Sequence, residues 1–196
     1  NSHPHLVRCK TTMYGAHNGN VTNCDDLKAW LTAEGHVVRS DNDGEMVVHT
    51  VEHHFALNLA ALPEALRLDP DARRGCMRAA IQTASARLQG SFAAVVVDPV
   101  SLCVWAIKSG SSLYFGYGHD DVGGRFCIAS SDLSSVLKLT RVLLPMREGE
   151  FVEYTADAYQ LYSTRDGARI TREPVRSRLR AKDTARLSTI RLLLAA

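Results

Sequence analysis

The sequence lacks the features that would mark a membrane, secreted or fibrous protein. No apolar run approaches the about 18 residues of a membrane-spanning helix, and the longest, near residues 92–97, is typical of a single buried strand. The first five residues carry neither a basic start nor an apolar core, so we expect no signal peptide. Internal repeats and low-complexity segments are also missing, which excludes solenoid and fibrous architectures. The sequence therefore predicts a globular protein without membrane contacts.

Cysteine is too scarce and too scattered to form a disulfide framework. The five cysteines are odd in number, lie far apart and include no CxxC pair. Free cysteines in this pattern are typical of a reducing compartment, where they pack as small apolar residues. We therefore expect a cytoplasmic protein.

The composition is that of one large or two small globular domains. The chain has 196 residues, of which 45% are apolar and 22% charged, and its net charge is only +2. That charge is uneven, because residues 165–191 hold nine Lys or Arg against three Asp or Glu. Such a segment can contact nucleic acid, but it is more typical of a solvated linker or of a tail docked on its own acidic domain. We expect no nucleic-acid partner.

Hydrophobic spacing predicts helices first and then a run of antiparallel strands. A strand over residues 11–16 is expected to end at His17-Asn18-Gly19, and a second short strand is expected over residues 36–39. Helices are predicted over about 23–33, 45–57 and 69–88, with a short one over 132–137 and an apolar segment at 187–194 that can dock as a helix. From Gly90 onward strands are predicted over 91–98, 101–108, 113–117, 125–130, 151–155, 158–163 and 168–171. This order indicates an α+β layered domain.

Eight histidines raise the question of a metal site. His49 and His53 stand four residues apart on a predicted helix, with Glu52 and His54 beside them, which is acceptable zinc-ligand spacing. A third ligand at a convincing spacing is missing, and the HExxH pattern does not occur. The sequence therefore predicts no metal site and no cofactor.

The Asn18-Gly19 pair is a candidate oxyanion site. An Asn side-chain amide and a neighbouring Gly backbone amide can both donate to one developing negative oxygen, and glycine allows the substrate to approach closely. The same dipeptide is also the commonest hairpin turn, so by itself it leaves a structural interpretation open.

Four short motifs occur in one order along the chain: NSHPH at the start, HNG at 17–19, SDNDGE at 40–45 and LQGSFA at 88–93. In this order they resemble the class II glutamine amidotransferase domain, most closely the glutaminase halves of glutamine–fructose-6-phosphate aminotransferases, which read NAHPH, HNG, S-x-T-D-T-E and L-x-G-x-[FY]. Later segments agree with the same pattern, among them FCIASSD at 126–132 and REGE at 147–150. The resemblance extends from Asn1 to about Thr155.

The resemblance implies a fold, a reaction and a set of residues. The fold is the four-layer αββα sandwich of N-terminal-nucleophile enzymes. In that family an N-terminal cysteine attacks the side-chain amide of glutamine, releases ammonia and leaves a glutamyl thioester. By position in the motifs, Asn18 and Gly19 form the oxyanion hole, Asp43 holds the α-amine of glutamine, and His3 lies near the glutamine pocket.

Two departures from the family pattern affect this interpretation. The nucleophilic cysteine and the R-W-A-T-H-G motif precede NAHPH in the family, and neither occurs in these 196 residues. We therefore expect that the nucleophile is not in this chain and that the domain lacks its upstream first segment. The family's Asp-Thr-Glu is also replaced by Asp43-Gly44-Glu45. We assign residues 1–172 to the amidotransferase domain and 173–196 to a basic linker or docking tail.

The sequence thus predicts an enzyme domain that releases ammonia from L-glutamine, for amino-sugar (glucosamine 6-phosphate) synthesis. Its partner would be an ammonia-accepting, sugar isomerase-like domain or subunit, and homo-oligomerisation is left open. Two alternatives remain: another class II amidotransferase of the phosphoribosylpyrophosphate or asparagine-synthesising type, and a non-catalytic regulatory module that retains the fold.

Overall fold

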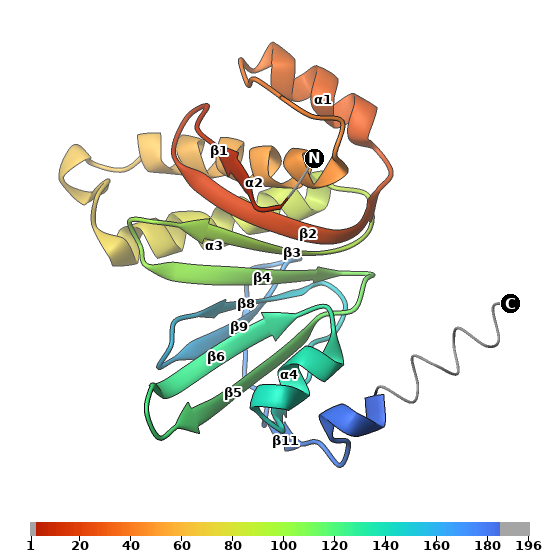
Figure 1. The fold of residues 1–196 in the computed structure, drawn as a ribbon. Coiled ribbons are helices and arrows are strands. Elements are labelled where there is room, and N and C mark those ends of the chain that lie inside the picture. The colour runs from red at the N-terminus through yellow and green to blue at the C-terminus, as the bar shows by residue number, and fades with distance from the viewer. Residues whose placement is uncertain (1–2, 185–196) are drawn as a thin grey trace, which may run out of the picture.

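Two antiparallel sheets and two layers of helices make up the structure (Figure 1). It is a computed structural model, and it describes residues 3–184. The larger sheet has seven strands in the order β1-β2-β3-β4-β8-β9-β10. Their bounds are β1 (His5–Val7), β2 (Met13–Val21), β3 (Gly90–Asp98), β4 (Cys103–Ser109), β8 (Glu150–Tyr154), β9 (Tyr159–Ser163) and β10 (Arg169–Ile170).

The smaller sheet has four strands in the order β11-β7-β5-β6. It is built on the hairpin of β5 (Tyr114–Asp120) and β6 (Gly124–Ser130), with β7 (Val142–Leu144) and β11 (Val175–Arg176) added beside β5. A cluster of buried side chains that includes Ala106, Phe115 and Val152 joins the two sheets. The sheets therefore pack face to face with a shared apolar core between them.

Helices cover the outer faces of this sandwich. The long helices α2 (Asp43–Ala60) and α3 (Pro70–Arg87) pack on the larger sheet and on each other, with α1 (Cys24–Ala33) beside α2 and the 3-10 turn η1 (Glu64–Leu66) between α2 and α3. The short helix α4 (Leu133–Leu139) packs on β5 and β6 (Figure 1). This is the αββα arrangement that the sequence resemblance implies.

The long helices begin at residues whose side chains satisfy free backbone amides. Asn42 precedes α2 and accepts a hydrogen bond from the Gly44 amide, while Asp69 precedes α3 and accepts one from the Ala72 amide. Pro70 occupies the first position of α3, where a missing amide has no cost. The predicted third helix is confirmed almost to the residue, and the second is longer than predicted at both ends.

Two predictions about local structure are wrong. His17-Asn18-Gly19 does not end a strand, because β2 continues to Val21 and pairs with β3 over this whole stretch, with Asn18 opposite Ala93. Pairing with a long neighbouring strand overrides the turn preference of Asn-Gly. Residues 36–39 form no strand, because the amides of Arg39 and Ser40 donate to the Glu45 carboxylate rather than to another strand.

The C-terminal region contributes to the small sheet as far as it is described. Val175 and Arg176 form β11 and pair with β7. The predicted helix at 187–194 lies outside the described residues, and the domain boundary after residue 172 stays a prediction. Among residues 3–184, no helix is both long and apolar enough to span a bilayer.

Candidate functional site

The two predicted oxyanion residues lie next to each other near the end of β2. Asn18 and Gly19 pair with Ala93 and Phe92 of β3, so the sheet fixes their backbone. Gly19 has a φ of 127°, and a Cβ at this position would collide with the Phe92 Cα and the Ser91 carbonyl. A side chain is therefore excluded at Gly19 by both backbone conformation and space.

The Asn18 amide is available to a ligand. It is exposed and makes no hydrogen bond to any of the described residues. It lines a cavity of about 230 Å³ together with Ala93 of β3 and Ser130 at the end of β6. A free amide at the rim of a cavity between the two sheets can donate to a bound oxygen, as an oxyanion donor must.

Asp43 is the first residue of α2 and is tied to the strand that carries Asn18. One carboxylate oxygen accepts a hydrogen bond of 2.8 Å from the Val21 amide, and the other lies 2.9 Å from Nε2 of His17. Burial by itself would raise the pKa of Asp43, but the Val21 amide and the His17 imidazole outweigh it and hold the pKa below its usual value. The carboxylate is 23% exposed and retains free lone pairs, so it can accept a further donor such as an ammonium group.

His17 links the Asn18-Gly19 pair, its neighbours on β2, to Asp43 on α2. The sequence patterns predict no role for His17. Successive residues of a strand point to opposite faces, so His17 faces α2 while Asn18 faces the smaller sheet. The His17 ring packs directly on the Gly44 backbone, in the space that a Cβ would fill. Its position in the HNG motif, beside Asn18, was the signal available in the sequence.

His3 lies close to the same cluster. Its ring centroid is 5.2 Å from that of His17 and 4.7 Å from that of His5, and His5 in turn contacts the Asn42 side chain at 3.2 Å. Burial, with the neighbouring imidazoles of His5 and His17, lowers the pKa of His3. The structure thus brings His3 and Asp43 to His17, whereas no hydrogen bond joins Asp43 to Asn18 within residues 3–184.

Four of the cysteines are in environments that suppress nucleophilicity. Burial raises the pKa of Cys24 and Cys76, and it raises the pKa of Cys103 and Cys127 to about 11. Each is therefore a protonated thiol at neutral pH, and the attacking species of cysteine chemistry is the thiolate. None of these four residues can replace an N-terminal cysteine at the site.

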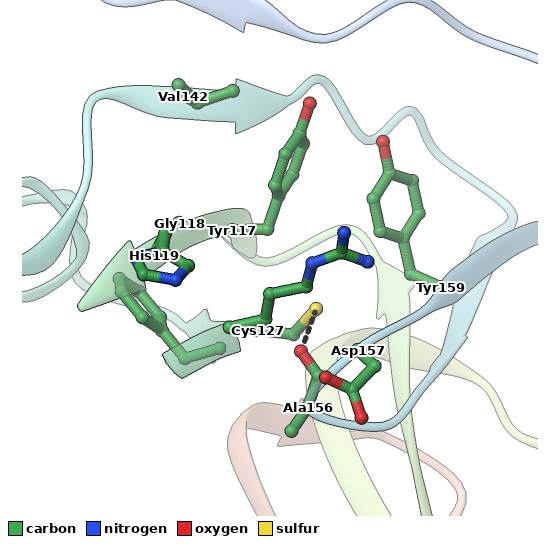
Figure 2. A pocket seen from close by; sticks show the side chains of 10 residues that line it. Tyr117, Gly118, His119, Cys127, Val142, Ala156, Asp157 and Tyr159 are labelled. Carbon is green, nitrogen blue, oxygen red and sulfur yellow. Dashed lines mark hydrogen bonds between the residues drawn. The ribbon is translucent and has the colours of Figure 1, made fainter. Parts of the chain in front are cut away.

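A larger cavity of about 460 Å³ lies elsewhere, beside β5, β6 and β9. Figure 2 shows the Tyr117 and Tyr159 rings above Cys127 and Asp157 in this cavity, and the two ring centroids are 5.2 Å apart. The Cys127 thiol contacts the Ala156 carbonyl at 3.8 Å. None of the sequence-predicted site residues lines it, so size alone does not locate the site.

Comparison with known families agrees with the fold. Residues 2–137 match the family described as "Glutamine amidotransferase domain", and the chain belongs to this family. It is therefore a glutamine amidotransferase domain, with the αββα fold of the N-terminal-nucleophile class.

Among curated proteins, the chain is similar to glutamine–fructose-6-phosphate aminotransferases. It is 30% identical to the enzyme of Clostridium tetani over 88% of this chain, and 30% identical to that of Thermotoga maritima over 86% of it. The chain spans about a quarter of the length of these relatives, 24% in both cases. Among solved structures, glutamine phosphoribosylpyrophosphate amidotransferase from B. subtilis matches 84% of this chain and 32% of its own, with a TM-score of 0.57 and 17% identity. That likeness concerns the fold alone.

Proposed function

We propose that this domain hydrolyses the side-chain amide of L-glutamine and supplies the ammonia for synthesis of an amino-sugar phosphate such as glucosamine 6-phosphate. The observation that carries the proposal is the joint placement of the motif residues: β2 presents the free Asn18 amide and Gly19, and its last residue is bonded to Asp43. The similarity to glutamine–fructose-6-phosphate aminotransferases supports the sugar acceptor.

In the proposed reaction each residue has a separate task. Asp43 pairs with the α-ammonium of glutamine, because an ionised carboxylate is the simplest partner for that group. The Asn18 amide and the Gly19 backbone amide stabilise the negative oxygen that forms when a cysteine sulfur attacks the amide carbon. Ammonia leaves, and water then hydrolyses the thioester. His3, in contact with the His17 ring, borders the glutamine pocket.

The attacking cysteine and the acceptor are proposed to come from other parts of the natural protein. An N-terminal cysteine is not among these residues, and the relatives are about four times as long as the matched segment. We further propose a cytoplasmic enzyme whose partner is a sugar isomerase-like domain or subunit, with no nucleic-acid partner. No feature of the site favours a phosphoribosyl or an asparagine-forming acceptor.

The test is ammonia release by the longest natural protein that contains these residues, with L-glutamine, L-asparagine and α-deaminated glutamine as substrates. Release from L-glutamine alone, increased by fructose 6-phosphate, is the expected result. Equal activity on the deaminated compound would contradict the role of Asp43, and release that another acceptor increases instead would contradict the sugar acceptor. No release from any of the three would favour a non-catalytic module and overturn the proposal.

A further inference from the structure

A second cluster of chemically reactive side chains lies outside the proposed glutamine site. Cys9 in the β1–β2 connection, His36 after α1 and His49 on α2 place one donor atom each within 4.8 Å of the other two. Both histidines are almost completely buried, with exposed fractions of 3% and 2%. Three residues from separate segments thus converge on one small volume.

The hydrogen bonds around His49 leave its Nδ1 atom as a lone-pair donor. Nε2 of His49 lies 3.3 Å from a carboxylate oxygen of Glu45. A carboxylate only accepts hydrogen bonds, and the two Glu45 oxygens already accept from the Arg39 and Ser40 amides. A neutral His49 therefore carries its proton on Nε2, and its Nδ1 faces the Cys9 sulfur at 3.8 Å and Nδ1 of His36 at 3.2 Å.

His36 can present its Nδ1 atom in the same way. Its Nε2 lies 3.0 Å from Nδ1 of His53, which can accept the ring proton of His36. Metal-bound histidines are typically oriented by such a bond from their second ring nitrogen to a carboxylate, carbonyl or water, and here Glu45 and His53 occupy the two outer positions. Sequence spacing had paired His49 with His53, whereas the fold places His53 behind His36.

The third donor atom is the Cys9 sulfur, which accepts a hydrogen bond from a backbone amide. The Val37 amide donates a hydrogen bond of 3.3 Å to the Cys9 sulfur. All three donor atoms lie within 4.8 Å of one another, and the two separations that involve His49 can be compared with those around one ion: ligands of a tetrahedral zinc at about 2.0–2.1 Å for nitrogen and 2.3 Å for sulfur lie roughly 3.3–3.6 Å apart. The observed separations of 3.2 and 3.8 Å fall close to these values.

A buried carboxylate oxygen beside the cluster has no hydrogen-bond partner. Glu52 is completely buried, and its Oε1 accepts hydrogen bonds from the Lys10 and Thr11 amides at 2.5 Å. Its Oε2 makes no hydrogen bond within the described part of the chain and lies 3.3 Å from Nδ1 of His36. An unpartnered buried carboxylate oxygen is costly unless a cation lies near it.

We propose that Cys9 Sγ, His36 Nδ1 and His49 Nδ1 bind one Zn²⁺ ion. Thiolate and imidazole donors in a tetrahedral arrangement favour zinc over the oxygen-preferring Mg²⁺ and Ca²⁺. The fourth position faces Glu52 or the adjoining cavity of about 320 Å³, which Cys9, Glu45 and His49 help to line. The ion ties the β1–β2 connection and the irregular segment after α1 to α2, the helix that begins with Asp43.

The direct test loads the purified, chelator-treated chain with Zn²⁺ and with Co²⁺. One ion per chain is expected, and the cobalt form should show a thiolate-to-metal charge-transfer band and the strong visible bands of tetrahedral coordination. X-ray absorption of the zinc form should show one sulfur at about 2.3 Å and at least two nitrogens at about 2.0 Å. Absence of binding, or a zinc shell without sulfur, would overturn the proposal without any variant being made.

Variants then assign the ligands. Cys9→Ser should abolish the charge-transfer band and weaken Zn²⁺ binding by roughly 100-fold or more, and Glu45→Gln should weaken it by about 10- to 100-fold. Cys24→Ser is the matched control, because Cys24 is another half-buried cysteine that lies outside the cluster. His54→Gln is the histidine control, since His54 stacks on Trp30. Binding lost equally in Cys24→Ser, or retained in Cys9→Ser, would contradict the assignment.

Discussion

At the residue scale, the His17 ring leaves no room for a side chain at position 44, where the resembling family has threonine. Gly44 lies in the first turn of α2, and a Cβ there would overlap the His17 ring. Nε2 of the same ring lies 2.9 Å from a carboxylate oxygen of Asp43. A side chain at position 44 would therefore push His17 away from the carboxylate proposed to bind the substrate ammonium.

Two glycine substitutions in helices test this contact. Replacing glycine by alanine inside a helix ordinarily stabilises a protein by about 0.5–1 kcal/mol. We expect this gain for Gly75→Ala on α3, where the added Cβ meets only the end of the Arg78 side chain at 3.7 Å. Gly44→Ala should instead lower the free energy of unfolding by about 1–3 kcal/mol, because it overpacks the His17 contact.

Chemical denaturation of both variants measures the difference. The free energy of unfolding should rise in Gly75→Ala and fall in Gly44→Ala. If Gly44→Ala stabilised the protein as much as Gly75→Ala does, the His17 packing described above would be wrong.

At the scale of elements, a buried ion pair holds α3 on the larger sheet. Two nitrogens of the Arg73 guanidinium donate to the two oxygens of Asp98 at the end of β3, both at 2.8 Å, and Asp98 is completely buried. Burial would raise the pKa of Asp98, but the hydrogen bonds from Arg73 and Ser101 outweigh it and the pKa lies below its usual value. The pair thus connects α3 to β3 through two charge-assisted hydrogen bonds.

Asp98→Asn should lower the free energy of unfolding by about 3–5 kcal/mol, because it leaves the buried Arg73 charge uncompensated. Asp71→Asn is the matched control on the same helix: Asp71 is 89% exposed in its pair with Arg74, so no measurable change is expected. Equal stability of the two variants in urea denaturation would contradict this role for Arg73 and Asp98.

The same pair predicts a pH dependence. Because the folded-state pKa of Asp98 is depressed, its stabilising contribution is fully present above the ordinary carboxyl pKa of about 3.9 and is lost as the pH falls through the lower folded value. The wild-type protein should therefore lose more stability between pH 5 and 3 (roughly the range where unfolded carboxyls titrate) than Asp98→Asn does.

At the scale of the whole molecule, the layer order was predictable and some pairings were not. Helical and strand periodicities located α3, whose N-terminus carries a capping residue, and seven of the strands from Gly90 onward; the short strands β7 and β11 were not predicted. The continuation of β2 through Asn18-Gly19 depends on β3, about 70 residues later, and no local pattern contains that information. The strand predicted over residues 36–39 is absent because the Glu45 carboxylate accepts the Arg39 and Ser40 amides, a contact that strand periodicity does not reveal.

The candidate site likewise has residues that the sequence predicts and contacts that only the fold reveals. Motif order predicts Asn18, Gly19, Asp43 and His3 as site residues, because the motifs are contiguous short segments. The part played by His17 and the convergence of Cys9 with His36 and His49 depend on contacts across the fold. Those ligand spacings, 27 and 13 residues along the sequence, match no short metal motif.

The basic C-terminal segment is engaged by the domain as far as it is described. Arg172 makes two 2.6 Å contacts with the Glu150 carboxylate, and the Arg141 side chain bonds to the Ser177 carbonyl. We therefore expect weak binding to duplex DNA or RNA that falls steeply with added salt, as measured by fluorescence anisotropy. Tight, sequence-dependent binding that persists at physiological salt would contradict a docked tail.

The kinetics of Asn18→Ala and Asp43→Asn, in the longest natural protein that contains this domain, test the central claim most directly. Asn18→Ala removes a donor used mainly in the transition state, so kcat for ammonia release should fall by roughly 100- to 1,000-fold, about 3–4 kcal/mol, with KM for glutamine little changed. Asp43→Asn removes the charge that meets the substrate ammonium, so it should raise KM most. Asn20→Ala, also exposed on β2, serves as the control and should leave both constants near wild type. Full activity with a lowered Tm in both site variants would contradict the account.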